Sequence, residues 1–126
     1  MKIGFIGTGN MGGAILKSYA GSAAAVGNEI LLHNRTTEHN EAMASAIRES
    51  YPESDQAGGN IRICNDNRQL EEEADIIIIG VKPKDVPGVL RDISPTEKII
   101  ISMAAGVSIS SIGEVLGNGK IIRIMP

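Results

Sequence analysis

The chain has 126 residues, a length that fits one domain with a single core and is too short for a cofactor domain plus a substrate domain. Hydrophobic residues make up 42% of the chain and charged residues 21%, as in ordinary globular proteins and unlike disordered chains. A formal net charge of -3 and an aromatic content of 2% supply neither the basic surface nor the stacking platform of a nucleic-acid binder, so we expect no such partner.

The cysteine content and the amino terminus indicate the compartment. Cys64 is the single cysteine, which excludes an internal disulfide and a multi-cysteine metal cluster, and we interpret it as a buried strand residue. The chain begins with a strand-like run and lacks the features of a secretory signal. Its apolar runs, such as Ile76–Ile79, are far shorter than the roughly 18 residues of a membrane span. We therefore expect a cytoplasmic protein with no bound metal and no membrane contact.

Apolar runs separated by glycines and polar turns predict strands that alternate with helices. The predicted elements are strand 3–6, helix 11–19, strand 30–33, helix 38–48, strand 61–64, helix 66–73, strand 74–81, helix 85–90, strand 98–102, helix 108–116 and strand 120–124. Residues 51–60 are expected to form a surface loop. Helical spacing predicts which residues of the first two helices face the sheet, namely Met11, Ile15 and Tyr19, and Ala42, Ala46 and Ile47.

The run Ala74–Val81 is apolar at almost every position, as in a central parallel strand with helices on both faces. Strands that alternate with helices imply right-handed crossovers and a parallel sheet. The predicted fold class is therefore α/β, a doubly wound parallel sheet of the Rossmann type with strand order 3-2-1-4-5-6. Residues 1–126 are expected to form this one domain.

The first turn carries the motif G-x-G-x-x-G, in the residues Gly7-Thr8-Gly9-Asn10-Met11-Gly12. A strand precedes it and a helix follows, which is the context that the motif requires. In that context the first glycine permits a tight turn, the second lets the backbone approach a pyrophosphate, and the third packs helix on strand. The motif therefore predicts a dinucleotide whose pyrophosphate lies at the helix amino terminus.

The second strand is followed by Asn34-Arg35-Thr36, where NAD-dependent enzymes place a carboxylate on the ribose 2′-hydroxyl. A carboxylate would repel a 2′-phosphate, whereas Arg35 can pair with one, and Asn34 and Thr36 can donate hydrogen bonds to it. The residues therefore favour NADP(H) as the cofactor and leave NAD(H) open.

Two further strand ends lie at the same edge of the predicted sheet. Gly80–Pro83 lies at the carboxyl end of the central strand and is expected to form a cofactor or substrate loop. Ser102–Gly106 ends the next strand with small residues, which allow close approach by a nicotinamide ring. No carboxylate pair, His–Cys pair or metal-ligand cluster emerges from the sequence, so the catalytic residues stay unknown. If a cofactor is bound, it must therefore supply the chemistry, and this indicates a hydride-transfer reaction.

Taken together, five segments resemble the pyrroline-5-carboxylate reductases: Gly4–Met11, Asn34–Thr36, Val81–Pro83, Ser102–Ile109 and Arg123–Pro126. The resemblance spans the whole chain. Many dehydrogenases share the glycine motif, but the ending Arg-x-Met-Pro is more specific. The resemblance implies NAD(P)H-dependent reduction of 1-pyrroline-5-carboxylate to L-proline, the last step of proline biosynthesis.

The resemblance also implies roles for individual residues. The pyrophosphate would lie on Gly7, Thr8, Gly9, Asn10 and Met11, and the 2′-phosphate would lie on Asn34, Arg35 and Thr36. Val81, Lys82 and Pro83 would line the ribose and nicotinamide side of the cofactor. The nicotinamide would lie near Ala104, Ala105 and Gly106, with Met125 and Pro126 at the mouth of the site. Family members carry a helical carboxyl-terminal domain that forms the dimer and binds substrate. This chain lacks it, so we expect a cofactor-binding domain that is inactive alone, from a homo-oligomeric enzyme.

Two other functions stay open at this point. One is a non-catalytic module that binds NADP(H). The other is a different NADP-dependent imine or ketone reductase, such as a 3-hydroxyacid dehydrogenase or a deazaflavin-dependent NADP oxidoreductase. The motifs Lys82-Pro83 and Met125-Pro126 favour the enzyme over the non-catalytic module, and the ending Arg-x-Met-Pro favours the pyrroline-5-carboxylate reductases over the other reductases.

Overall fold

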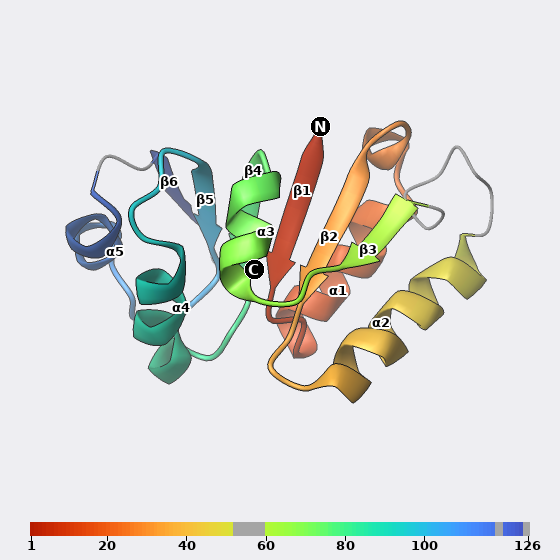
Figure 1. Ribbon diagram of the computed structural model, residues 1–126, viewed down its shortest axis with the longest axis horizontal. Helices are drawn as coiled ribbons and strands as arrows, with labels where there is room; N and C mark the ends of the chain where they lie inside the picture. Colours follow the sequence, from red (N-terminus) through yellow and green to blue (C-terminus); the bar gives the residue numbers. More distant parts are fainter. Residues whose placement is uncertain (52–59, 118–119, 125–126) are drawn as a thin grey trace.

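A computed structural model describes residues 1–51, 60–117 and 120–124. Six parallel strands form one sheet in the order β3-β2-β1-β4-β5-β6, which confirms the predicted Rossmann-type fold (Figure 1). The strands are β1 (Lys2–Ile6), β2 (Glu29–His33), β3 (Ile61–Ile63), β4 (Ile76–Ile79), β5 (Ile99–Ser102) and β6 (Lys120–Arg123).

The five predicted helices are all present, and the described residues also contain the 3-10 turns η1 and η3. The helices are α1 (Asn10–Ala20), α2 (Thr37–Ser50), α3 (Asn67–Glu73), α4 (Val86–Ile93) and α5 (Ile109–Leu116), and the turns are η1 (Ala23–Ala25) and η3 (Pro83–Asp85). The predicted cap of α3 is confirmed, since the side chain of Asp66 accepts a hydrogen bond from the N–H of Gln69. Most of the predicted loop 51–60 lies outside the described residues.

Helices cover both faces of the sheet, as a doubly wound fold requires. On one face, residues of α3, α4 and α5 pack with the buried side chains Ile77 and Ile100. On the other, residues of α1 and α2 pack with Phe5 and Leu32. Cys64 is buried directly after β3, as expected, and burial raises the pKa of its thiol.

The helix faces that contact the sheet differ in part from those predicted. In α1 the buried residues are Gly12, Gly13, Leu16 and Ala20. The predicted Ile15 and Tyr19 are partly buried against the core, whereas Met11 is 46% exposed. In α2 the buried face carries Ala44 and Ile47, and the predicted Ala42 is exposed. Gly12 packs against Gly7 and Gly80 and shares the buried face of α1 with Leu16 and Ala20, so Met11, one position before it, lies outside this face.

The two faces are covered to different extents. In β4 the side chains of Ile77 and Ile79 are fully buried, but those of Ile76 and Ile78 are only half-buried. At the sheet edge, Ile122 of β6 is 50% exposed. Three helices thus cover one face, and α1 and α2 cover the β1–β2–β3 side of the other more than the β5–β6 side.

None of the helices in the described residues is long and apolar enough to cross a membrane.

Candidate dinucleotide-binding site

The glycine turn after β1 is packed backbone against backbone with the loop that follows β4. Gly7 has a φ of +83°, a conformation that favours glycine, and a Cβ there would strike Val81. A Cβ on Gly12 would meet the carbonyl oxygen of Gly7, and one on Gly80 would lie 3.0 Å from the Cα of Gly12. Glycine at these positions lets β1, α1 and the β4 loop converge.

Gly9 differs from these neighbours because a Cβ there would meet no protein atom within 4 Å. The residue is exposed and immediately precedes α1, whose first N–H groups have no partner within the helix. Packing within the chain gives no reason for glycine at this position. Glycine at this position instead leaves space for a ligand close to the backbone, which is the role predicted for the second glycine of the motif.

A buried polar network joins the glycine turn to the end of β2. The side-chain oxygen of Asn34 accepts a hydrogen bond of 2.6 Å from the N–H of Thr8, and its amide nitrogen donates to the Thr8 hydroxyl at 2.8 Å. Both residues are less than 10% exposed. The N–H of Gly7 also donates to the carbonyl of His33 at 3.0 Å. Asn34 therefore uses its side-chain amide to hold the turn.

Two residues of α2 that were not predicted as site residues complete this network. Asn40 accepts from the N–H of Asn34 at 2.6 Å and donates to its carbonyl at 3.1 Å. The Nε2 atom of His39 lies 2.9 Å from the carbonyl oxygen of Thr8, which can only accept, so the ring donates. Asn40 shares a helix face with Ala44 and Ile47, and this polar residue in an apolar stripe is the signal that reveals it.

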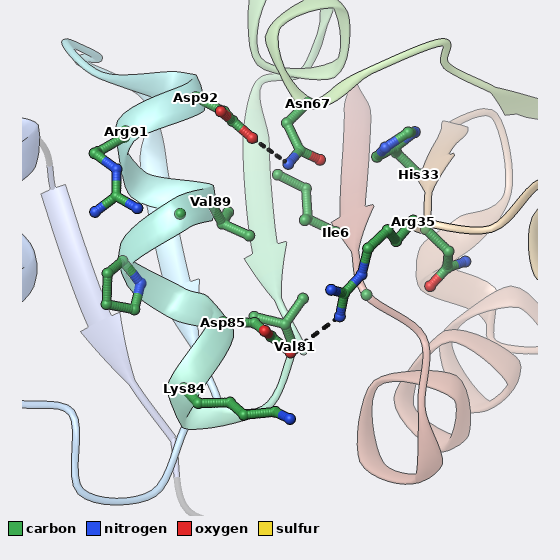
Figure 2. A pocket seen from close by; sticks show the side chains of 14 residues that line it. Ile6, His33, Arg35, Asn67, Val81, Lys84, Asp85, Val89, Arg91 and Asp92 are labelled. Carbon is green, nitrogen blue, oxygen red and sulfur yellow. Dashed lines mark hydrogen bonds and ion pairs between the residues drawn. The ribbon is translucent and has the colours of Figure 1, made fainter.

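The carboxyl edge of the sheet is hollowed into a cleft with two adjoining parts. One part, of about 310 Å³, contains eight of the predicted cofactor residues: Gly7, Thr8, Gly9, Asn34, Arg35, Thr36, Val81 and Lys82. The other part, of about 430 Å³, extends to Asn67 of α3 and to Asp92 of α4. Figure 2 shows α4 on one side of this second part and the ends of β1 and β2 on the other. The structure thus brings together residues from three separate predicted motifs.

Charged side chains of both signs line the cleft. The positive ones are Arg35, Lys82, Lys84 and Arg91. An Nη atom of Arg35 pairs with a carboxylate oxygen of Asp85 at 3.3 Å across the cleft (Figure 2). Asp92 accepts a hydrogen bond of 3.1 Å from Asn67. The positive charges beside an open glycine turn suit a ligand with several phosphates.

Of the other predicted residues, Met11, Pro83, Ala104, Ala105 and Gly106 do not line either part of this cleft. Asn10 is the first residue of α1, Lys82 and Pro83 are exposed, and Thr36 immediately precedes α2 without capping it through its side chain. After β5, Ala104 is buried, whereas Ala105 and Gly106 are exposed. Met125 and Pro126 lie outside the described residues.

These features fit a bound dinucleotide. The space above Gly9 admits a pyrophosphate, the amino terminus of α1 favours its charge, and Arg35 and Thr36 lie in the same hollow for a 2′-phosphate. The position also agrees with the rule that ligands of open parallel sheets bind at the carboxyl ends of the strands, where the strand order reverses. The fold and this cleft define a Rossmann-type dinucleotide-binding domain.

Comparison with known proteins identifies the family. Residues 2–106 match the model of the family described as NADP oxidoreductase, coenzyme F420-dependent, and the chain belongs to this family. Among curated proteins it is similar to the pyrroline-5-carboxylate reductase of Methanosarcina acetivorans, with 33% identity over 99% of this chain and 43% of the relative.

Two solved structures have the same fold over the whole chain. One is 1-pyrroline-5-carboxylate reductase from Streptococcus pyogenes, with a TM-score of 0.76 and 27% identity over 100% of this chain and 42% of that protein. The other is pyrroline carboxylate reductase from Plasmodium falciparum with NADP bound, with a TM-score of 0.73 and 25% identity over 100% and 42% of the respective chains. The chain therefore spans less than half the length of these relatives.

Proposed function

We propose that the chain binds NADP(H) and forms the cofactor-binding domain of a pyrroline-5-carboxylate reductase. The observation that carries this proposal is the similarity to a reductase of that name over 99% of the chain at 33% identity. The open glycine turn and the position of Arg35 in the same cleft support it independently.

The proposed cofactor site follows the cleft from the glycine turn to the end of β2. Gly7, Thr8, Gly9, Asn10 and Met11 form the turn around the pyrophosphate, which the N–H groups at the start of α1 bind. Gly7 and Thr8 shape this turn, because their own N–H groups already donate to His33 and Asn34. Arg35 and Thr36 bind the 2′-phosphate. Asn34 contributes by orienting the turn and the segment that carries Arg35, since its side-chain amide is already bonded to Thr8 and Asn40.

The proposed nicotinamide side lies toward β4 and β5. Val81, Lys82 and Pro83 bind the adjoining ribose, and Ala104, Ala105 and Gly106 leave room for the flat ring. The reduced nicotinamide, when bound, supplies a hydride to the carbon of the C=N bond of 1-pyrroline-5-carboxylate; the nitrogen gains a proton, and L-proline and NADP⁺ are the products. The chain's own residues orient the ring and keep its reactive face toward the substrate.

The rest of the active site is proposed to come from the helical domain of the family, outside residues 1–126. In this proposal that domain binds the substrate, forms a homo-oligomer and completes a cytoplasmic enzyme of amino-acid biosynthesis. The domain of 126 residues binds cofactor by itself but is inactive without its counterpart.

A second candidate is an NADP oxidoreductase that uses the deazaflavin coenzyme F420, and the family model that matches residues 2–106 favours it. The experiment that separates the two candidates assays the full-length gene product with NADPH and one of two acceptors. One reaction contains 1-pyrroline-5-carboxylate, and a parallel reaction contains oxidised F420. We expect proline to form and F420 to stay oxidised. Reduction of F420 without proline formation would support the second candidate, and turnover of neither would favour a non-catalytic module.

A further inference from the structure

Asp85 occupies the position before α4, where an aspartate commonly caps a helix by accepting from the N–H two or three residues further on. Its side chain makes no such bond, and its φ of -93° and ψ of -11° are helical rather than extended. The residue two positions on is Pro87, which has no N–H to donate. The carboxylate is therefore available to a partner outside its own helix.

That partner is Arg35, which follows β2 and is 50 residues away in sequence. The two side chains meet at 3.3 Å, and both line both parts of the cleft (Figure 2). The Arg35 side chain is 83% exposed and that of Asp85 only 28%. The long, exposed arginine can swing to another anion, whereas the shorter and more sheltered carboxylate stays in the cleft.

We propose that Asp85 sets the preference between NADPH and NADH by competing with the 2′-phosphate for Arg35. This inference rests on the proposed function, in which Arg35 binds that phosphate. For NADPH to bind, Arg35 must exchange its carboxylate partner for the phosphate, and Asp85 then stays close to a second anion. NADH carries a neutral 2′-hydroxyl and requires no such exchange. Asp85 therefore weakens NADPH binding selectively and brings the affinities of the two cofactors closer together.

The test is a double-mutant cycle followed by calorimetric titration with NADPH and with NADH at low ionic strength. The proteins are the unchanged chain, Asp85→Asn, Arg35→Ala and the double variant, with Asp85→Ser as a second substitution. Glu114→Gln, on the exposed surface of α5, is the matched control for the change in net charge. Thermal unfolding of each protein checks that it is folded.

We expect Asp85→Asn and Asp85→Ser to tighten NADPH binding about two- to fivefold, the range of an exposed ion pair, and to leave NADH binding unchanged. The gain should be smaller when Arg35 is absent, and Glu114→Gln should not change the ratio of the two affinities. Weaker NADPH binding, an equal gain for both cofactors, or the same gain without Arg35 would overturn the inference. If the unchanged chain bound neither cofactor, the proposed function would fail as well; if it bound both and Asp85→Asn changed nothing, this inference alone would fail.

Discussion

The backbone N–H of Thr8 donates a hydrogen bond of 2.6 Å to the side chain of Asn34, so the glycine turn after β1 is held by a residue at the end of β2. Both residues are buried, and the bond joins segments that are 26 residues apart. Because the two segments line the same cleft, this contact helps to fix the geometry of the proposed pyrophosphate and 2′-phosphate sites relative to each other.

Asn34→Ala should lower the free energy of unfolding by about 2–4 kcal/mol, because it removes buried hydrogen bonds and leaves the N–H of Thr8 without a partner. It should also weaken NADPH and NADH binding to similar extents, since it displaces the turn that both cofactors contact. Denaturant unfolding and calorimetry measure the two effects. Asn28→Ala is the control: its half-buried amide donates to Ala24 and Tyr19, and its loss should cost about 1 kcal/mol or less without changing cofactor affinity.

The glycines of the turn should separate into two classes. Gly12→Ala should destabilise the fold by about 1–3 kcal/mol, because the new methyl group meets the backbone of Gly7, which cannot move aside. Gly9→Ala should change stability by no more than about 1 kcal/mol, because its methyl group meets no protein atom. It should still reduce NADPH affinity more than tenfold (roughly 1.4 kcal/mol), since the methyl group occupies the approach of the pyrophosphate. Normal affinity in a folded Gly9→Ala protein would contradict the assigned position of the pyrophosphate.

Arg35→Ala should weaken NADPH binding about ten- to hundredfold and NADH binding much less, because only NADPH carries the 2′-phosphate that the guanidinium pairs with. Arg91→Ala is the matched control, since Arg91 is an exposed cation in the adjoining part of the cleft. Its loss should affect both cofactors alike. Equal losses for NADPH and NADH in Arg35→Ala would contradict the assignment of the 2′-phosphate to Arg35.

The acid stability of the fold should depend on Glu73. Hydrogen bonds of 2.7 and 3.2 Å from Arg62 lower the pKa of this carboxyl from its ordinary value of 4.5. A lowered pKa in the folded state contributes stability that is present above the unfolded pKa and is lost as the pH falls through the folded pKa. Glu73→Gln should therefore destabilise the protein at neutral pH, with an effect that fades below about pH 4.5.

Unfolding curves of the unchanged protein and of Glu73→Gln across this pH range measure the effect. Glu72→Gln, exposed on the same helix, should show no such pH-dependent difference. A destabilisation by Glu73→Gln that persisted unchanged at acid pH would indicate a role in packing rather than in charge pairing.

Much of this architecture was predictable from local patterns. The strand order follows from the alternation of apolar strands with helices, and the site at the glycine turn follows from Gly7, Gly9 and Gly12 directly after a strand. The position of Arg35 in the cleft follows because β1 and β2 are neighbours whose carboxyl ends meet at one edge.

Other features depend on tertiary contacts that hydropathy patterns do not encode. The sequence marks Asn40 only as a polar residue in an apolar stripe, and its role depends on a tertiary contact, because its amide satisfies the backbone of Asn34. Asp85 was not predicted in the site because it meets Arg35 only after α4 packs on the sheet. Met11 was predicted to face the core from its spacing, but Gly12 packs against Gly7, and the buried face of α1 runs from Gly12 instead, so that Met11 faces outward.

The most direct test of the central claim, that this chain is an NADP(H)-binding domain, is a calorimetric titration of residues 1–126 with NADPH. We expect saturable binding of one NADPH for each chain, weakened more than tenfold in Gly9→Ala while the variant stays folded. A folded chain that releases no heat of binding with NADPH, or a Gly9→Ala variant that binds as tightly as the unchanged chain, would contradict it.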